Sequence, residues 1–267
     1  MDTSFRVAAV QMISTPDVKT NLERAGELIA RAASDGAQLA LLPEYFGIMG
    51  RETDKVAVRE RDGNGPMQAF LRDTAQRLHL WIIGGTVPLE CEDVTRVRNT
   101  TLVYDPSGKR VARYDKIHLF GFTHGEEQYH EARTIEPGAQ TIAFDTPLGQ
   151  VGLSVCYDLR FPELYRRYAG ASLIVVPAAF TAVTGEAHWE ILLRARAIEN
   201  QCYVLAAAQG GTHPNGRKTH GHSMLVDPWG VVVAQMGKGE GVVVGDIDPA
   251  RLRDVRKNLP ALEHRTL

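Results

Sequence analysis

The chain contains the stretch Val151-Gly-Leu-Ser-Val-Cys-Tyr-Asp-Leu-Arg-Phe-Pro-Glu163, in which apolar residues stop abruptly at a thiol and a polar segment follows. This pattern predicts a buried β-strand that ends at Cys156 and leads into a helix. A side chain at such a junction can face a cleft, and the following helix N-terminus would stabilise negative charge on sulfur. Because a lone cysteine is most often a buried structural residue, the thiol needs support from other residues.

Two further predicted strands also end at ionisable residues. The stretch Ala37-Gln-Leu-Ala-Leu-Leu-Pro-Glu44 is typical of a buried strand, and Pro43 interrupts its hydrogen bonding just before the carboxylate. An alternating strand from Arg110 reaches Lys116, and an apolar stretch follows. Either charge alone would be interpreted as solvated surface. Three strand ends carrying Glu, Lys and Cys favour a shared site.

Length and composition favour one domain that acts on a small molecule. The 267 residues are 44% hydrophobic, which is enough for one substantial core, so we expect a single domain over residues 1–267. The net charge is -2 and the charges are interspersed, which argues against nucleic-acid and anionic-membrane partners. No apolar run reaches the ~20 residues of a membrane span, and no secretory leader precedes the first strand. A cytoplasmic protein is expected.

The three cysteines, Cys91, Cys156 and Cys202, form an odd set, which indicates free thiols in a reducing compartment rather than a disulfide framework. Cys202 lies in an apolar run and is predicted to pack in the core. Cys91 lies in an acidic loop. Neither has surroundings that would activate it as Cys156 is activated.

Alternating strands and amphipathic helices predict a layered α/β architecture. Asp-Pro-x-Gly turns at 105–108 and 227–230 predict two β-hairpins. Helices are expected over 19–33, 67–78, 162–168 and 188–200. Strands are expected over 7–11, 37–44, 81–87, 101–104, 110–116, 151–156, 173–176, 203–206, 224–226, 231–234 and 242–246.

Taken together, these segments resemble the carbon–nitrogen hydrolase (nitrilase-like) superfamily over essentially the whole chain. The Nit branch is indicated by Gly185-Glu-Ala-His-Trp-Glu190, Arg194-Ala-Arg-Ala-Ile-Glu-Asn200, Gly221-His-Ser-Met224 and Asp227-Pro-Trp-Gly230. Within that branch the chain most resembles the deaminated-glutathione amidases. The resemblance implies an α/β fold in a four-layer α-β-β-α sandwich, and a homodimer or larger homo-oligomer.

The resemblance also implies catalytic roles. Cys156 would be the nucleophile that forms a thioester, Glu44 the general base and acid, and Lys116 the cation that stabilises the oxyanion. A second glutamate usually supports the lysine and the catalytic carboxylate. Glu131 is the choice by its position after the lysine, and Glu127 is the alternative.

Substrate-binding residues are expected beside the nucleophile. The backbone N–H of Tyr157 would be a second oxyanion donor, and Phe180 and Thr181, like Phe46, follow predicted strand ends and would line the cleft. Arg160 could bind a substrate carboxylate bidentately. An ion pair with Glu163 or Asp158 is an equally weighted alternative for this arginine.

No cofactor or metal is expected, because His220 and His222 are the one close histidine pair and no carboxylate or cysteine cluster completes a zinc site. The reaction implied is hydrolysis of a linear carboxamide, with deaminated glutathione cleaved to 2-oxoglutarate and cysteinylglycine. An ω-amidase acting on 2-oxoglutaramate is the first alternative. The second is a non-catalytic scaffold that binds a protein partner.

Overall fold

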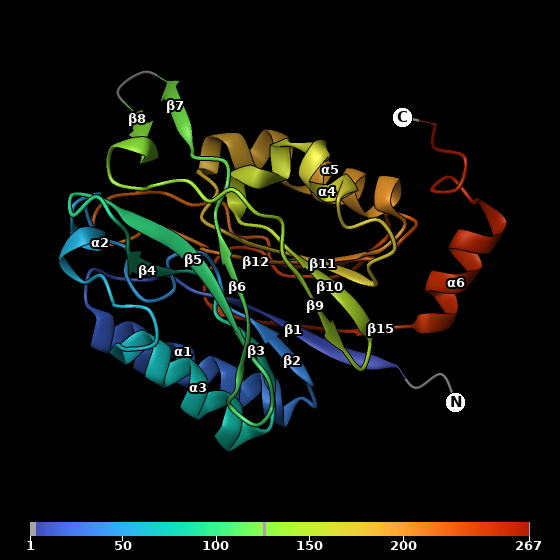
Figure 1. The fold of residues 1–267 in the computed structure, drawn as a ribbon, viewed down its shortest axis with the longest axis horizontal. Coiled ribbons are helices and arrows are strands. Elements are labelled where there is room, and N and C mark those ends of the chain that lie inside the picture. The colour runs from blue at the N-terminus through green and yellow to red at the C-terminus, as the bar shows by residue number, and fades with distance from the viewer. Residues whose placement is uncertain (1–3, 125–126, 267) are drawn as a thin grey trace.

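The computed structural model describes residues 4–124 and 127–266 (Figure 1). Two β-sheets pack face to face, and helices cover the outer face of each. The fold is therefore the four-layer α-β-β-α sandwich that the sequence resemblance implied. In the described ranges, no helix is both long enough and apolar enough to cross a membrane.

The first sheet has the strand order β15-β1-β2-β3-β5-β4, with β6 paired to β5. β1 runs parallel to β2 and antiparallel to β15, so the last strand of the chain lies beside the first. The strands are β1 (Phe5–Gln11), β2 (Leu39–Leu41), β3 (Trp81–Ile83), β4 (Val87–Glu90), β5 (Val97–Tyr104), β6 (Arg110–Asp115) and β15 (Gly241–Ile247).

The second sheet has the order β14-β13-β12-β11-β10-β9, and β10, β11 and β12 are parallel. Every residue of β11 and β12 is buried, as expected for parallel strands covered on both faces. The strands are β9 (Ala143–Thr146), β10 (Gly149–Leu153), β11 (Leu173–Ala178), β12 (Tyr203–Ala208), β13 (Met224–Val226) and β14 (Val232–Gln235).

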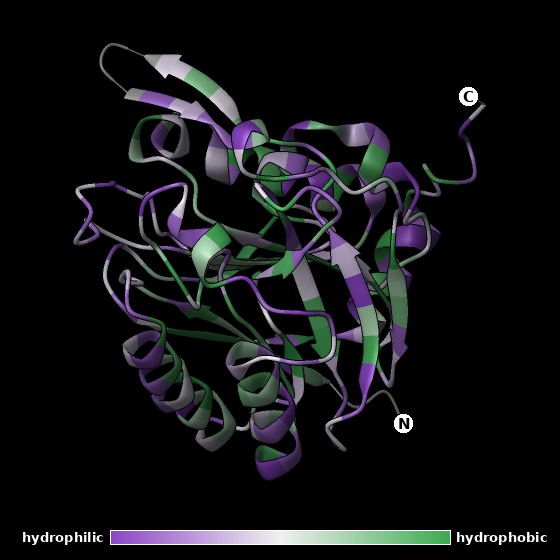
Figure 2. Cartoon of the chain, turned by 60° about the vertical axis from the view of Figure 1, so that its left-hand side comes forward, coloured by the Kyte–Doolittle hydropathy of each residue, from purple (hydrophilic) through white to green (hydrophobic). Residues whose placement is uncertain are grey.

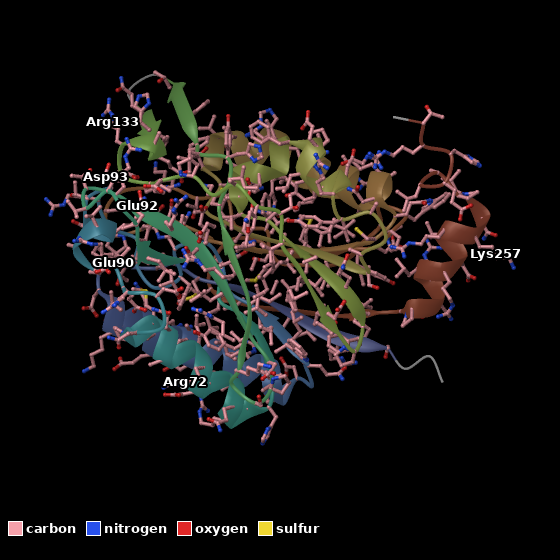
Figure 3. All side chains as sticks on the ribbon, in the orientation of Figure 1. Arg72, Glu90, Glu92, Asp93, Arg133 and Lys257 are labelled. Carbon is pink, nitrogen blue, oxygen red and sulfur yellow. The ribbon has the colours of Figure 1, made fainter. Side chains whose placement is uncertain are left out.

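Side-chain alternation along β1 explains how the layers meet. Val7 and Ala9 belong to the core between the two sheets, whereas Val10 packs in the core beneath α1 (Val18–Ser34) and α3 (Pro66–Leu78). Ala8 is buried with Ala32 of α1. Figure 2 shows the central strands largely in the hydrophobic colour, and Figure 3 shows side chains filling the space between the sheets while Arg72 and Lys257 point outward.

The helices form where the sequence caps them. The Asp17 carboxylate accepts a hydrogen bond from Thr20 N at the start of α1. On the second sheet lie α4 (Pro162–Arg166) and α5 (Ala182–Asn200). The other helical segments are α2 (Asp54–Ala57), η1 (Glu131–Arg133), η2 (Cys156–Arg160) and α6 (Pro249–Asn258).

Several predicted bounds were wrong. α5 begins at Ala182 rather than near residue 188, because the Thr181 hydroxyl accepts from Thr184 N and caps it there. The segment predicted as one strand over 81–87 is divided at Gly85, whose φ of 48° and approach to the Pro43 carbonyl leave no room for a Cβ atom. After Lys116 the chain forms a two-stranded β-ribbon that was not predicted, β7 (Gly121–His124) and β8 (Glu127–His130).

Both predicted hairpins are confirmed, since β5 pairs antiparallel with β6 and β13 with β14. The strand over 224–226 has the predicted bounds. α6 was not predicted. Most other strands extend one to three residues beyond the predicted ends or stop short of them.

Candidate active site

Three strand ends from the two sheets supply the central residues of the site. Glu44 follows β2, Lys116 follows β6, and Cys156 follows β10. Lys116 is 0% exposed, Glu44 1% and Cys156 7%. Glu44 and Lys116 are therefore not solvated surface charges. The charges of Glu44 and Lys116 both act on the thiol of Cys156. The structure therefore brings the three predicted residues together.

The Glu44 carboxylate is held by three donors. Its Oε1 accepts from Lys116 Nζ at 2.9 Å and from Asn99 Nδ2 at 2.9 Å. Its Oε2 accepts from the backbone N–H of Ala179 at 2.9 Å. Charge-assisted bonds of this kind fix the orientation of a buried carboxylate. Glu44 is thereby preorganised beside the lysine.

Glu131, the predicted supporting carboxylate, lies on the other side of the lysine. Its Oε2 accepts from Lys116 Nζ at 2.7 Å and from Phe120 N at 2.8 Å. Its Oε1 accepts from the Tyr45 hydroxyl at 2.7 Å. Burial by itself would raise the pKa of Glu131, but Lys116 and then Lys55 lower the pKa to about 2. The side chain of Glu127, the alternative, lies outside the described residues.

Lys116 is a permanently charged ammonium between two carboxylates. Burial opposes the charge and would lower the pKa of this lysine, yet Glu131 and Glu44 together raise the pKa above its ordinary value of 10.5. A buried cation in this position is stabilised by the geometry rather than by solvent. It can act on negative charge that develops nearby.

Cys156 leaves its strand through an unusual backbone conformation. Its φ is 48°, a left-handed value that costs a residue with a Cβ atom roughly 1 kcal/mol. The buried carboxylate of Asp158 supports the turn, because Oδ2 accepts from Val155 N at 2.8 Å and from the Tyr114 hydroxyl at 2.7 Å. Oδ1 accepts from His118 N at 3.0 Å. Cys156 is therefore held out of the sheet.

The thiol is more basic than the sequence suggested. Burial and then Glu44 raise the pKa of Cys156 well above its ordinary value, and the opposing effect of Lys116 does not restore it. The negative charge that the helix N-terminus was expected to stabilise on sulfur is therefore opposed by burial and by Glu44. This direction favours the protonated thiol at neutral pH, so the sulfur would need a nearby base in order to act as a nucleophile.

A narrow pocket opens above the thiol, with about 260 Å³ of empty space when the open solvent at its mouth is counted. It contains all four predicted substrate-binding residues, Tyr157, Arg160, Phe180 and Thr181. The lining is Phe120, Glu131, Cys156, Tyr157, Arg160, Ala179, Phe180, Thr181, Thr184 and Arg217. Phe46 is not among these residues, because its ring packs in the core beneath α1 and α3, against Phe70.

Arg160 lies against aromatic rings rather than in an ion pair. Its guanidinium carbon is 5.7 Å from the Tyr157 ring centroid and 5.3 Å from that of Phe180. Its Nη1 lies 3.3 Å from His188 Nδ1. In residues 4–124 and 127–266 no ion pair joins Arg160 to Asp158 or Glu163, so that alternative finds no support.

Asn99, Tyr45 and Arg217 are among the residues of the site that were missed in the sequence. Asn99 lies on β5 and Tyr45 follows Glu44, while Arg217 comes from the segment between β12 and β13. Tyr45 stands next to a predicted site residue, which is the one signal that could have suggested it. Asn99 and Arg217 carry no local signal, because their contacts with the site join residues far apart in the chain.

The other cysteines match their predicted surroundings. Cys202 is fully buried, and Cys91 is partly exposed; both are free thiols. Within the described ranges no group of three or more His, Cys, Asp or Glu side chains is arranged to hold a metal ion.

Comparison with known proteins adds independent findings. A family model described as carbon–nitrogen hydrolase matches residues 6–257. A Synechocystis sp. protein named deaminated glutathione amidase is 43% identical to this chain. The alignment is 267 positions long and covers 98% of each chain. The structure of Saccharomyces cerevisiae Nit3, a member of branch 10 of the nitrilase superfamily, has a TM-score of 0.90 at 32% identity and covers 99% of this chain and 97% of its own.

A third relative bears on the cysteine. The amidase from Nesterenkonia sp. AN1 has a TM-score of 0.79 at 29% identity, with 96% of this chain and 98% of that chain covered. In that structure acrylamide has been added at the active site cysteine. The sequence and the fold described above thus resemble these proteins over almost their whole length.

Proposed function

This chain belongs to the carbon–nitrogen hydrolase family, and from that premise we propose that it is a thiol amidase whose reaction passes through a thioester on Cys156. As a member of the family it is a hydrolase that cleaves carbon–nitrogen bonds in amides. The observation that carries the proposed mechanism is the Lys116 ammonium, held 2.9 Å from Glu44 and 2.7 Å from Glu131 beside a buried thiol.

In the acylation half, Glu44 takes the thiol proton while sulfur attacks the amide carbon, and the carbonyl electron pair moves to oxygen. The Lys116 ammonium and the Tyr157 N–H stabilise this oxyanion. When the oxyanion collapses, the carbon–nitrogen bond breaks and Glu44 gives its proton to the departing nitrogen. The products of this half are a free amine and a thioester on Cys156.

In the deacylation half, a water molecule attacks the thioester carbon and gives a proton to Glu44. The second tetrahedral intermediate collapses and releases a carboxylic acid, and the sulfur recovers its proton from Glu44. One amide and one water are consumed, and one acid and one amine are formed. Glu44 serves as base and then acid in each half of the reaction, which requires the fixed orientation that its three donors provide.

Glu131 is proposed as a positioning residue. It contacts Lys116 and Phe120 rather than the reacting atoms. Because its pKa is lowered to about 2, it remains ionised and keeps the lysine charged at neutral pH. The charge of Lys116 is then available to the oxyanion although Glu44 alternates between its two protonation states.

The proposed substrate is deaminated glutathione, cleaved to 2-oxoglutarate and cysteinylglycine in metabolite repair. The names of relatives such as the Synechocystis and human proteins support this choice, at 43% and 41% identity. Arg160 would bind the carboxylate of the 2-oxo acid half, because its guanidinium lines the pocket with no acidic partner among the described residues.

One assay tests this proposal against the ω-amidase alternative. Deaminated glutathione and 2-oxoglutaramate are offered at equal concentration, and cysteinylglycine and ammonia are measured. We expect faster release of cysteinylglycine and an acyl adduct on Cys156 by mass spectrometry. Faster release of ammonia would support the ω-amidase, and no adduct with any of a panel of amides would support the scaffold.

We further propose that the chain forms one domain over residues 1–267 and works as a homo-oligomer in the cytoplasm. Free thiols support a reducing compartment. Large apolar side chains exposed on and beside the outer face of α5 support self-association: Ile191 is 70% exposed, Ile198 49% and Trp229 54%. Light scattering of the wild type and of Ile191→Lys tests the assembly, since the charge should shift it towards monomer.

A further inference from the structure

A second guanidinium, that of Arg217, lines the pocket. Its Nη2 donates to the Ala179 carbonyl at 3.0 Å, and its guanidinium carbon lies 5.2 Å from the Tyr129 ring centroid. Its Nη1 lies 4.0 Å from the sulfur of Met49. The Nε–H is buried and has no hydrogen-bond partner among the described residues. The side chain thus has donor capacity that the surrounding protein does not use.

Arg217 also has no carboxylate in direct contact, although the charges of Glu44 and Glu131 reach it. In the described ranges no Asp or Glu oxygen lies within ion-pair distance of it. Burial would lower the pKa of Arg217, but the more distant groups Tyr45 and Glu44 raise it, so the guanidinium stays protonated. A buried cation with an unsatisfied donor is costly unless it binds an anion. Its surroundings therefore suit a carboxylate ligand.

The position of Arg217 indicates which half of the substrate it faces. The arginine donates to the carbonyl of Ala179, and the N–H of the same residue donates to Glu44. In the proposed mechanism Glu44 protonates the departing amine, so the amine half of the substrate must lie on the Glu44 side. Arg160 lies elsewhere in the pocket, against Phe180 and His188.

We propose that Arg217 binds a carboxylate on the amine half of the substrate. This inference rests on the proposed function and extends it. The pocket then recognises amides that carry one carboxylate on each side of the scissile bond, with Arg160 on the acyl side and Arg217 on the amine side. An amide whose leaving group is ammonia cannot use Arg217, and the arginine thereby selects against simple dicarboxylic monoamides.

The test compares two substrates that differ in this one charge: deaminated glutathione, and its analogue with the terminal glycine carboxylate replaced by a carboxamide. Release of 2-oxoglutarate is measured for both. For the wild type, kcat/KM should favour the acid by on the order of 10- to 100-fold, mainly through KM. Arg217→Gln should bring this ratio close to one. Because the ratio compares substrates on one variant, any effect of Arg217 on Glu44 cancels.

Arg160→Gln is the matched control. It removes the other pocket guanidinium and should leave the acid-to-carboxamide ratio unchanged, because both compounds share the acyl half. Arg217→Lys keeps the charge and loses the planar donors, so it should retain part of the preference. This variant and the wild-type ratio decide the question if Arg217→Gln does not fold.

A wild-type ratio near one overturns the inference, as does a ratio that survives in Arg217→Gln. Neither outcome would contradict amide hydrolysis itself. If the wild type releases no 2-oxoglutarate from either compound, the proposed substrate is wrong, and that result is visible before any variant is made.

Discussion

The Tyr45 hydroxyl donates to Glu131 Oε1 over 2.7 Å, so a residue adjacent to the proposed base holds the carboxylate that anchors the lysine. Lys55 Nζ lies 3.4 Å from the same hydroxyl and stacks over the tyrosine ring. Charges of alternating sign therefore extend from Lys55 through Glu131 to Lys116. The orientation of the proposed catalytic cation therefore depends on Tyr45 and Lys55, which do not line the pocket, as well as on Glu131, which does.

Tyr45→Phe should lower kcat by roughly tenfold with little change in KM, because Glu131 loses one donor and Lys116 becomes less well positioned. The free energy of unfolding should fall by about 1 to 2 kcal/mol. Tyr203→Phe is the matched control, since that hydroxyl bonds the backbone of Asp248 far from the pocket. Equal loss of kcat in both variants would contradict a positioning role for Tyr45.

Cys156→Ala should abolish hydrolysis and leave the fold intact, because the attacking atom is lost from a site otherwise supported by Asp158. Turnover and thermal unfolding are measured together. Cys202→Ala provides the comparison: it removes a fully buried sulfur and should cost about 1 kcal/mol of stability while turnover persists. Near-native turnover in Cys156→Ala would refute the assigned nucleophile.

Glu44→Gln should also abolish hydrolysis, yet it should make the thiol more acidic. After burial, the charge of Glu44 is the largest influence that raises the pKa of Cys156, and Lys116 opposes it. Iodoacetamide should therefore alkylate Cys156 of this variant at lower pH than in the wild type, as followed by peptide mass spectrometry. Labelling of the partly exposed Cys91 serves as the internal reference. An alkylation profile that moves to higher pH would show that Glu44 does not act on the thiol in this way.

Stability in acid should depend on Glu131. Its pKa is lowered from 4.5 to about 2 in the folded protein, chiefly by Lys116 and Lys55 against the effect of burial. The ionised carboxylate therefore stabilises the fold above the unfolded-state value, and this contribution is lost as pH falls towards 2. Between pH 4.5 and pH 2, the free energy of unfolding should fall by about 3 kcal/mol more for the wild type than for Glu131→Gln. Urea titrations at several pH values measure the free energy of unfolding of both proteins. If this free energy depended on pH in the same way for both, the linkage would be excluded.

Local patterns in the sequence predicted the residues that end strands. Apolar runs that stop at Glu44 and Cys156 are visible without any partner, because burial on both faces makes the strand itself continuous. The turns at 105–108 and 227–230 are equally local. Glu131 was found through the family resemblance. Its ion-pair partner, Lys116, lies a short way before it in the chain.

What the sequence did not reveal depends on contacts between distant segments. Arg217 reaches Ala179 and the pocket from the segment between β12 and β13, and no periodicity marks it. α6 was missed because two buried side chains, Leu252 and Val255, are too few to produce a clear apolar stripe. The bounds of α5 depended on a cap at Thr181 that was interpreted as part of a cleft.

The division of the site between the two sheets has a consequence for how turnover can be used. The carboxylate and the ammonium follow strands of one sheet, and the sulfur follows a strand of the other. Neither half of the sandwich carries a complete reactive set. Hydrolysis therefore requires the two sheets to be packed in register, so the recovery of turnover during refolding should report that packing.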